Sequence, residues 1–289
     1  MFRIIPFEEI EKNKWNGTVH YSTNGNVFGY HWYLKALVGE WDALVENDYE
    51  TVLPIFKQPL KPHQYSLLME SGPYSVNPMT DPRVEEILEI LHEKNKSSQY
   101  PLHSIVSKRQ LEKVMYKTRK KAVLGGGFNY EKLSKNYSDD LKYDLLEKGY
   151  DAVKVNSGLK PELLVSLSKE NEDYKNAMMR IMYNAMHRGI GFSSAIEDRS
   201  TGKVLAASFF VNTNATLIEV FSTDRGGKKY RQLIYDLMLR NNSGSPYKFE
   251  TFFKVDDLHE MGFDSEPVFD LQLKRSVMIN FRKSFGRAH

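Results

Sequence analysis

Residues 191–221 read GFSSAIEDRSTGKVLAASFFVNTNATLIEVF, and this stretch decides the fold. Apolar and polar residues alternate with a period of two in three segments, 191–197, 203–212 and 215–221. The turns between these segments are short and rich in Gly, Asn, Ser and Thr. The pattern predicts three antiparallel strands, because such short turns join only antiparallel neighbours.

A helix and a fourth strand extend this pattern. After residues 225–229, apolar side chains recur with helical spacing at Tyr230, Leu233, Ile234, Leu237 and Met238. Segment 247–253 then has the composition of a strand, and its connection through a helix predicts that it runs parallel to strand 215–221. Two helices are predicted before the strands, at 161–171 and 174–186.

The first half of the chain repeats this order of elements. It predicts a hairpin of 40–45 and 49–56, a strand at 64–69, a helix at 82–92 and a strand at 99–106. Gly125-Gly126-Gly127 is the best candidate for a join between the halves. We therefore expect an α+β fold with two lobes, residues 1–126 and 127–289, each with a mixed, mostly antiparallel sheet flanked by helices.

Composition narrows the classes of function. The chain has 289 residues, 41% of them hydrophobic, so it can bury a sizeable core. A formal net charge of +3 is too small for whole-protein electrostatics to drive nucleic-acid or membrane binding. The absence of Cys excludes disulfides, thiolate nucleophiles and iron–sulfur ligation, and the eight His lack metal-ligand spacing, so no metal is predicted. With no signal peptide pattern and no apolar run long enough for a membrane span, we expect a soluble, cytoplasmic protein.

Several local segments resemble one known superfamily. Residues 41–45 (WDALV) with 49–54 (YETVLP), and residues 129–133, 137–142 and 163–172, are similar to segments of tandem GNAT proteins, the acyl-CoA N-acyltransferase superfamily, related to Fem-type aminoacyltransferases. The resemblance covers nearly the whole chain, and it implies two GNAT-like lobes. The chain departs from the family pattern at Arg225-Gly226-Gly227, where the glycines follow the arginine at once. It also reads Phe249-Glu250-Thr251-Phe252 where relatives tend to have Phe-Glu-Gly-Ser.

The loop before the second-half helix is the candidate binding site for an acyl donor. Gly226 and Gly227 let backbone amides approach an anion, the helix start adds partial positive charge, and Arg225, Lys228 and Lys229 add full charges. The alternative is a solvated turn with a basic helix start. The resemblance implies that the anion is the pyrophosphate of acetyl-CoA or another acyl-CoA.

Two acids are candidate general bases for amine acyl transfer. Glu219 and Glu250 each stand alone in an otherwise apolar strand, and partial burial would raise the pKa of either one. The alternative is that each lies on an exposed face of its strand. Tyr235 or Tyr247 is a candidate proton donor to the leaving group.

The resulting hypothesis is an N-acyltransferase that acts on a small-molecule or peptide amine in a cleft between the lobes. A first alternative is Fem-like transfer from aminoacyl-tRNA to a cell-wall precursor, with the basic stretches 107–121 and 274–289, and their nearby Tyr116, Phe281 and Phe285, as the tRNA contacts. A second is a non-catalytic binding protein on the same scaffold. The sequence predicts neither the acyl group nor the oligomeric state.

Overall fold

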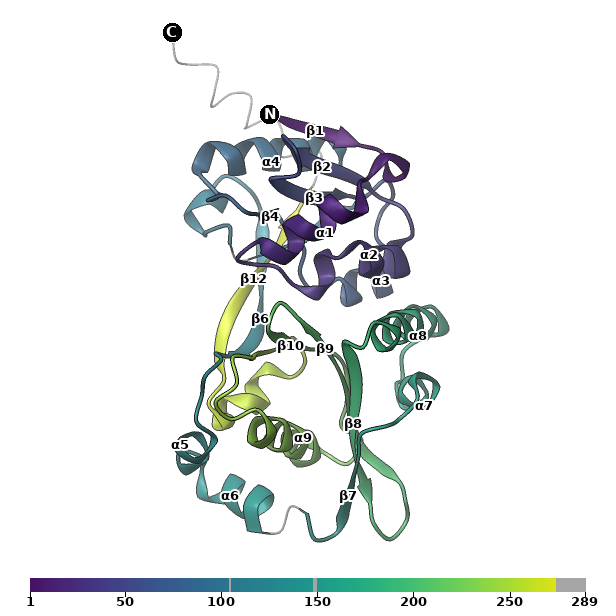
Figure 1. Cartoon of the computed structure of the whole chain (residues 1–289), viewed down its shortest axis with the longest axis vertical. Coiled ribbons are helices and arrows are strands. Elements are labelled where there is room, and N and C mark those ends of the chain that lie inside the picture. The colour runs from purple at the N-terminus through teal and green to yellow at the C-terminus, as the bar shows by residue number, and fades with distance from the viewer. Residues whose placement is uncertain (104, 148–149, 274–289) are drawn as a thin grey trace. The chain divides into compact units, whose positions relative to one another are not determined.

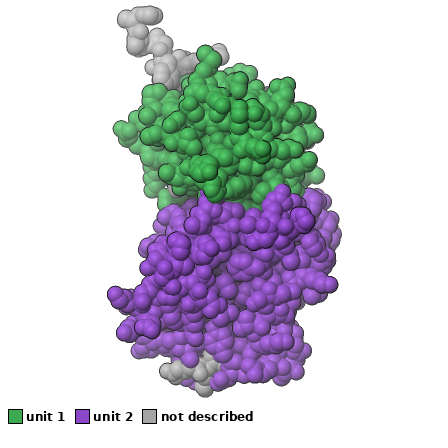
Figure 2. Space-filling model, viewed as in Figure 1, with its two compact units in different colours: residues 1–119, 267–289 green, residues 120–266 purple. Residues whose placement is uncertain are grey.

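The computed structural model describes residues 1–103, 105–147 and 150–273. Contacts divide the chain into two compact units (Figure 2). Unit 1 comprises 1–119 and the chain from 267 onward, and unit 2 comprises 120–266. The division into lobes at residue 126 stays a prediction.

Unit 1 contains a four-stranded antiparallel sheet in the order β1-β2-β3-β4 (Figure 1). Its strands are β1 (Phe2–Ile5), β2 (Asp42–Glu46), β3 (Thr51–Ile55) and β4 (Tyr74–Ser75). Pairing of Asp42 with Ile55 and of Glu46 with Thr51 confirms the predicted hairpin. The helices of this unit are α1 (Lys12–Tyr21), α2 (His31–Val38), α3 (Pro62–Leu67) and α4 (Asp81–Lys94), with 3₁₀ turns η1 (Phe7–Glu9), η2 (Val27–Gly29) and η3 (Arg109–Leu111).

The strand predicted at 64–69 is wrong, because most of that segment forms α3. Pro62 occupies the first turn of the helix, where its missing N–H costs no hydrogen bond. The backbone N–H of Lys61 donates to the Gln64 side chain at 2.9 Å, which closes the helix start. The strand that pairs with β3 at the edge of this sheet is instead the two-residue β4. The predicted helix at 82–92 is confirmed as α4.

The larger sheet has eight strands in the order β5-β12-β6-β11-β10-β9-β8-β7. Its strands are β5 (Gln99–Leu102), β6 (Tyr116–Leu124), β7 (Val153–Asn156), β8 (Gly191–Asp198), β9 (Val204–Thr213), β10 (Thr216–Thr223), β11 (Lys248–Thr251) and β12 (Asp264–Gln272). The three antiparallel strands predicted from 191–221 are confirmed as β8, β9 and β10. The predicted parallel pairing is confirmed too, since β11 runs parallel to β10.

Helices cover both faces of the unit 2 sheet (Figure 1). They are α5 (Tyr130–Lys135), α6 (Asp139–Lys142), the π-helical turn η4 (Tyr143–Glu147), α7 (Pro161–Ser166), α8 (Glu172–His187), α9 (Lys228–Asn241) and the 3₁₀ segment η5 (Val255–Met261). One core forms where Leu233, Ile234 and Tyr235 of α9 pack on Phe210 and Phe249 of the sheet. The residues that the structure describes contain no helix with both the length and the hydropathy of a membrane span.

Candidate functional site

The candidate site lies where the two parallel strands β10 and β11 end. Their pairing joins Thr216 to Lys248 and stops at Glu219 and Thr251, and a register shift between Glu219 and Phe221 bends β10 at that point. Helix α9 connects the two strands, so its first turn follows directly from the carboxyl end of β10. In sheets with such parallel connections, ligands bind outside the carboxyl ends of the strands.

Backbone geometry explains both glycines of the loop before α9. Gly227 precedes the helix with φ +108°, which favours glycine. A Cβ on Gly226 would lie 2.7 Å from the Tyr230 ring, so this position requires close approach. The Gly226 N–H donates to the Leu205 carbonyl at 2.7 Å and the Gly227 N–H to the Asp224 carbonyl at 2.9 Å. The amides left for an anion are therefore those of Lys228 and Lys229, which begin the helix and have no carbonyl four residues before them within it.

The three cations of the loop are exposed, but they differ in their contacts. The Lys228 ammonium lies 3.4 Å from Glu260, whereas Arg225 and Lys229 form no ion pair with any described residue. Lys254 bonds Asp224 next to the loop and neutralises its carboxylate. The edge therefore presents positive charge together with two helix-start amides, an arrangement that favours a phosphate group. Donor binding by Arg225, Gly226, Gly227, Lys228 and Lys229 stays a prediction.

Glu219 is fully buried and lies in a dense network of donors. Its carboxylate accepts hydrogen bonds from Arg231 at 2.7 Å, and from the hydroxyls of Ser208 at 2.5 Å, Thr251 at 2.6 Å and Tyr235 at 2.8 Å. Burial alone would raise the pKa of Glu219, but the charge of Arg231 and these hydrogen bonds outweigh it, and the pKa is lowered. The predicted rise in its pKa is thus wrong. These contacts favour a structural role for Glu219.

Arg231 joins the strands at the point where their pairing stops. Its guanidinium, on a side chain only 1% exposed, donates to Glu219 and also to the Phe253 carbonyl at 2.8 Å. Tyr235 is fully buried beside it, and burial raises the pKa of Tyr235 well above its usual value. Tyr235 therefore keeps its proton in a place that solvent does not reach.

Glu250 belongs to a different network. Its neighbours on β11, Phe249 and Thr251, face α9, so alternation directs Glu250 to the opposite face of the sheet. There its carboxylate lies 2.6 Å from the ammonium of Lys248 and 3.5 Å from that of Lys121, which is 1% exposed. The structure thus brings Glu219 and Tyr235 together and separates them from Glu250. The catalytic roles of all three stay predictions.

Sequence reasoning missed Arg231, although one signal was available. Arg231 shares a helix face with Ile234, Tyr235 and Met238, all of them buried. A lone cation on an apolar helix face, next to a strand with a lone acid, predicts a buried ion pair. The partners of Lys121 carried no such signal, because Glu250 and Glu266 are far away in the sequence.

Other predicted features have less distinctive surroundings. Within 107–121, Arg109 pairs with Asp81 and Lys113 with Glu85, so part of this basic stretch is neutralised locally. The basic stretch 274–289, with Phe281 and Phe285, lies outside the described residues. Tyr247 is half-buried against the core of unit 2. In the described ranges no group of three or more His, Asp or Glu is placed to hold a metal ion.

Three solved structures share the fold of this chain over nearly its whole length. FemX is 8% identical, covering 93% of this chain and 96% of its own, with a TM-score of 0.57. L-PGS from Bacillus licheniformis is 10% identical, with coverage of 96% and 97% and a TM-score of 0.52. A tandem GNAT protein from the clavulanic acid biosynthesis pathway is 8% identical, with coverage of 94% and 97% and a TM-score of 0.51.

These similarities confirm the tandem GNAT, Fem-like fold expected from the sequence. No protein-family model matches the chain, and no curated protein matches it. At identities of 8–10%, what the chain shares with the three structures is the fold.

Proposed function

We propose that this chain is an N-acyltransferase that holds the phosphate-bearing carrier of its acyl donor at the first turn of α9. The observation that supports the proposal is the positively charged edge of the sheet beyond the carboxyl ends of β10 and β11. These two strands form the only parallel pair among the described strand registers. There the helix-start amides of Lys228 and Lys229 lie beside the exposed Arg225. Acyl-CoA is the first candidate donor, since its pyrophosphate suits this combination of amides and cations.

The reaction would form one bond and break one. The amine nitrogen of the acceptor attacks the acyl carbon, the bond from that carbon to the carrier breaks, and the carrier atom takes up a proton. A base must first remove a proton from the acceptor ammonium. We place Glu250 ahead of Glu219, because Glu250 has two lysine partners, Lys248 and Lys121, whereas the fully buried Glu219 accepts hydrogen bonds from Arg231 and from three hydroxyls.

Aminoacyl-tRNA is the second candidate donor. Arg231 bridges the end of the β10–β11 pairing through Glu219, Thr251 and the Phe253 carbonyl. Its buried side chain thereby occupies the point where the pairing of β10 and β11 stops. A donor held along the outer surface of the loop is compatible with a large polyanion, and exposed Lys120 of β6, which belongs to the same unit, would add a phosphate contact.

Donor binding is the first experiment. Thermal unfolding of the full chain is measured with CoA, acetyl-CoA and aminoacyl-tRNA, because a ligand that binds only the native state raises its stability. We expect one donor class to raise the midpoint, and Arg225→Ala/Lys228→Ala to weaken its binding about tenfold or more, since each lost charged hydrogen bond is worth about 1.5–3 kcal/mol.

A matched control removes the same charge elsewhere. Lys169→Ala/Lys203→Ala deletes two exposed cations outside the loop and should leave binding unchanged. Equal loss in both double variants would mean that net charge, and not the loop, attracts the donor. The absence of binding to all three probes at millimolar CoA and micromolar tRNA would contradict the proposed function.

A further inference from the structure

A cavity of about 230 Å³ lies in unit 2 beside the first turns of α9. Three segments line it: the π-helical turn η4, the start of β7 and the face of α9 that carries Lys229, Tyr230 and Leu233. Short π-helical turns are rare and occur frequently at functional sites. The cavity is partly open to solvent, since Tyr143, Asp144 and Lys229 are exposed, and its volume leaves room for a small organic molecule.

The lining of this cavity includes buried apolar side chains and exposed charged ones. Leu233 is 1% exposed and Val153 4% exposed, and together they give an apolar floor. The Tyr143 and Tyr230 side chains add aromatic surface. Lys229 and Asp144 bring one positive and one negative charge from two different segments. The cavity therefore combines a hydrophobic surface with both signs of charge.

These two charges differ from the neighbouring Lys228 in their contacts. No described residue forms an ion pair with Lys229 or with Asp144, whereas the neighbouring Lys228 pairs with Glu260. The contact of the Lys229 ammonium is the Tyr230 ring, 5.1 Å from its nitrogen to the ring centroid. A ligand that brings its own carboxylate and ammonium would complement both groups and would leave no unpaired charge in the cavity.

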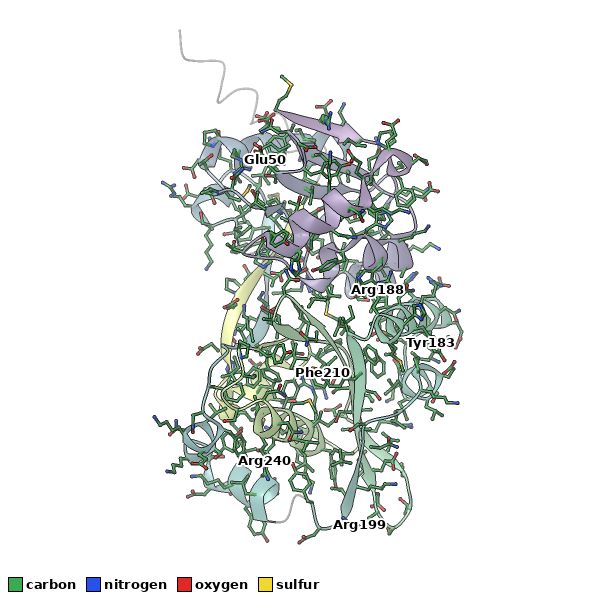
Figure 3. All side chains as sticks on the ribbon, in the orientation of Figure 1. Glu50, Tyr183, Arg188, Arg199, Phe210 and Arg240 are labelled. Carbon is green, nitrogen blue, oxygen red and sulfur yellow. The ribbon has the colours of Figure 1, made fainter. Side chains whose placement is uncertain are left out.

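The wall formed by the start of β7 is held in place from two directions. Arg199, in the turn after β8 (Figure 3), donates from its guanidinium to the Val153 carbonyl at 3.0 Å. Its backbone N–H donates to the Ala152 carbonyl at 2.9 Å. The Tyr150 hydroxyl bonds Asp236 of α9 at 3.3 Å, and the Arg240 guanidinium lies 5.5 Å from the Tyr150 ring centroid. These contacts preorganise the wall before any ligand arrives.

We infer that this cavity binds a free α-amino acid as its zwitterion, with an apolar or aromatic side chain. Lys229 pairs with the carboxylate of the ligand, Asp144 pairs with its ammonium, and the side chain packs on Leu233, Val153 and the tyrosine rings. An ammonium held by Asp144 is not a nucleophile, so the cavity is a recognition site and not a reaction centre. The inference does not depend on the proposed function, because binding requires no acyl donor.

Calorimetric titration of the full chain with L-leucine and L-phenylalanine, without any donor, tests the inference. We expect binding of both, and at least about tenfold weaker binding in Asp144→Asn and in Lys229→Gln, because each variant removes a charge-assisted hydrogen bond. L-leucinamide lacks the carboxylate and should bind weakly to the wild type. Lys229→Gln should no longer distinguish L-leucine from L-leucinamide.

Two results would overturn this inference. One is the absence of heat with either amino acid at millimolar concentration, and the other is equal binding in wild type, Asp144→Asn and Lys229→Gln. Lys203→Gln is the matched control, since it removes an exposed lysine outside the cavity. Because Asp144 is not part of the donor loop, Asp144→Asn should retain any binding of CoA or tRNA, so failure of this site and failure of the proposed function are distinguishable.

Discussion

Replacing Glu219 with glutamine tests whether the buried network at the end of β10 and β11 stabilises unit 2. Glutamine keeps the shape of the side chain and removes its charge. Arg231, whose side chain is 1% exposed, would then be a buried cation without its ion-pair partner. The three hydroxyls that now donate to Glu219 would compete for a single amide oxygen.

The size of the effect follows from these contacts. Removing one partner of a buried ion pair destabilises a protein by about 3–5 kcal/mol. Each hydroxyl left without an acceptor adds about 1–3 kcal/mol, although a hydroxyl can rotate toward a new partner. We therefore expect Glu219→Gln to lower the free energy of unfolding by about 4 kcal/mol, a large fraction of the roughly 5–15 kcal/mol that is typical of a folded domain.

Urea unfolding followed by circular dichroism measures this change. Tryptophan fluorescence provides a second probe that reports on unit 1, since Trp15, Trp32 and Trp41 all lie there. The matched control is Glu260→Gln, which breaks an exposed ion pair with Lys228 and should cost less than about 1 kcal/mol. Equal and small effects of the two variants would refute the reasoning that Glu219 is the centre of a stabilising network.

Two further predictions concern stability. Burial, with smaller contributions from Lys12 and Lys35, lowers the pKa of His31 from 6.5 to about 4. Above pH 6.5 His31 is neutral in both the folded and the unfolded state, so its burial costs no stability there, and the cost appears as the pH falls below 6.5. Unfolding free energies measured by urea titration should then fall by up to roughly 3 kcal/mol more between pH 6.5 and pH 4 in the wild type than in His31→Phe, and equal slopes would contradict this. Gly126→Ala should lower the thermal midpoint, because a Cβ there would lie 2.2 Å from the Pro246 carbonyl oxygen, whereas Gly125→Ala has open space and should be nearly neutral. Equal midpoints for the two alanine variants would rule out the close approach at Gly126.

Periodicity predicted the elements whose neighbours are close in the sequence. Strands β8, β9 and β10 alternate clearly and are joined by short turns, so local pattern and tertiary structure agree. The segment 64–69 shows the limit of this reasoning, because a short apolar run fits a strand or a helix equally well. There the decisive contacts are the Gln64 side chain with the Lys61 N–H and with the Leu37 carbonyl, which lies well before it in the chain.

The charged residues of β6 prevented its prediction as an inner strand of the sheet. Residues 116–121 include four cations, a composition that is typical of a solvated surface. In the structure Arg119 pairs with Asp270 at 2.6 Å, and the buried Lys121 lies between Glu250 and Glu266. These partners lie in β11 and β12, more than a hundred residues later in the chain, so no local sequence pattern could predict them. The same limit applies to Glu219. The sequence shows a lone acid in an apolar strand, but it does not predict the four side chains that donate hydrogen bonds to it.

Unit 1 contains two segments that are far apart in the sequence. Phe269–Gln272 of β12 pair with Gln99–Leu102 of β5, and residues 103–263, which include most of unit 2, lie between these two strands in the sequence. At ribosomal speeds of about 5–20 residues per second, β12 is synthesised roughly 10–30 s after β5. We expect unit 2 to be able to fold on the ribosome during that interval. The edge of β5 meanwhile stays open to pairing with other nascent chains, so slow synthesis of 120–266 should favour aggregation over completion of unit 1.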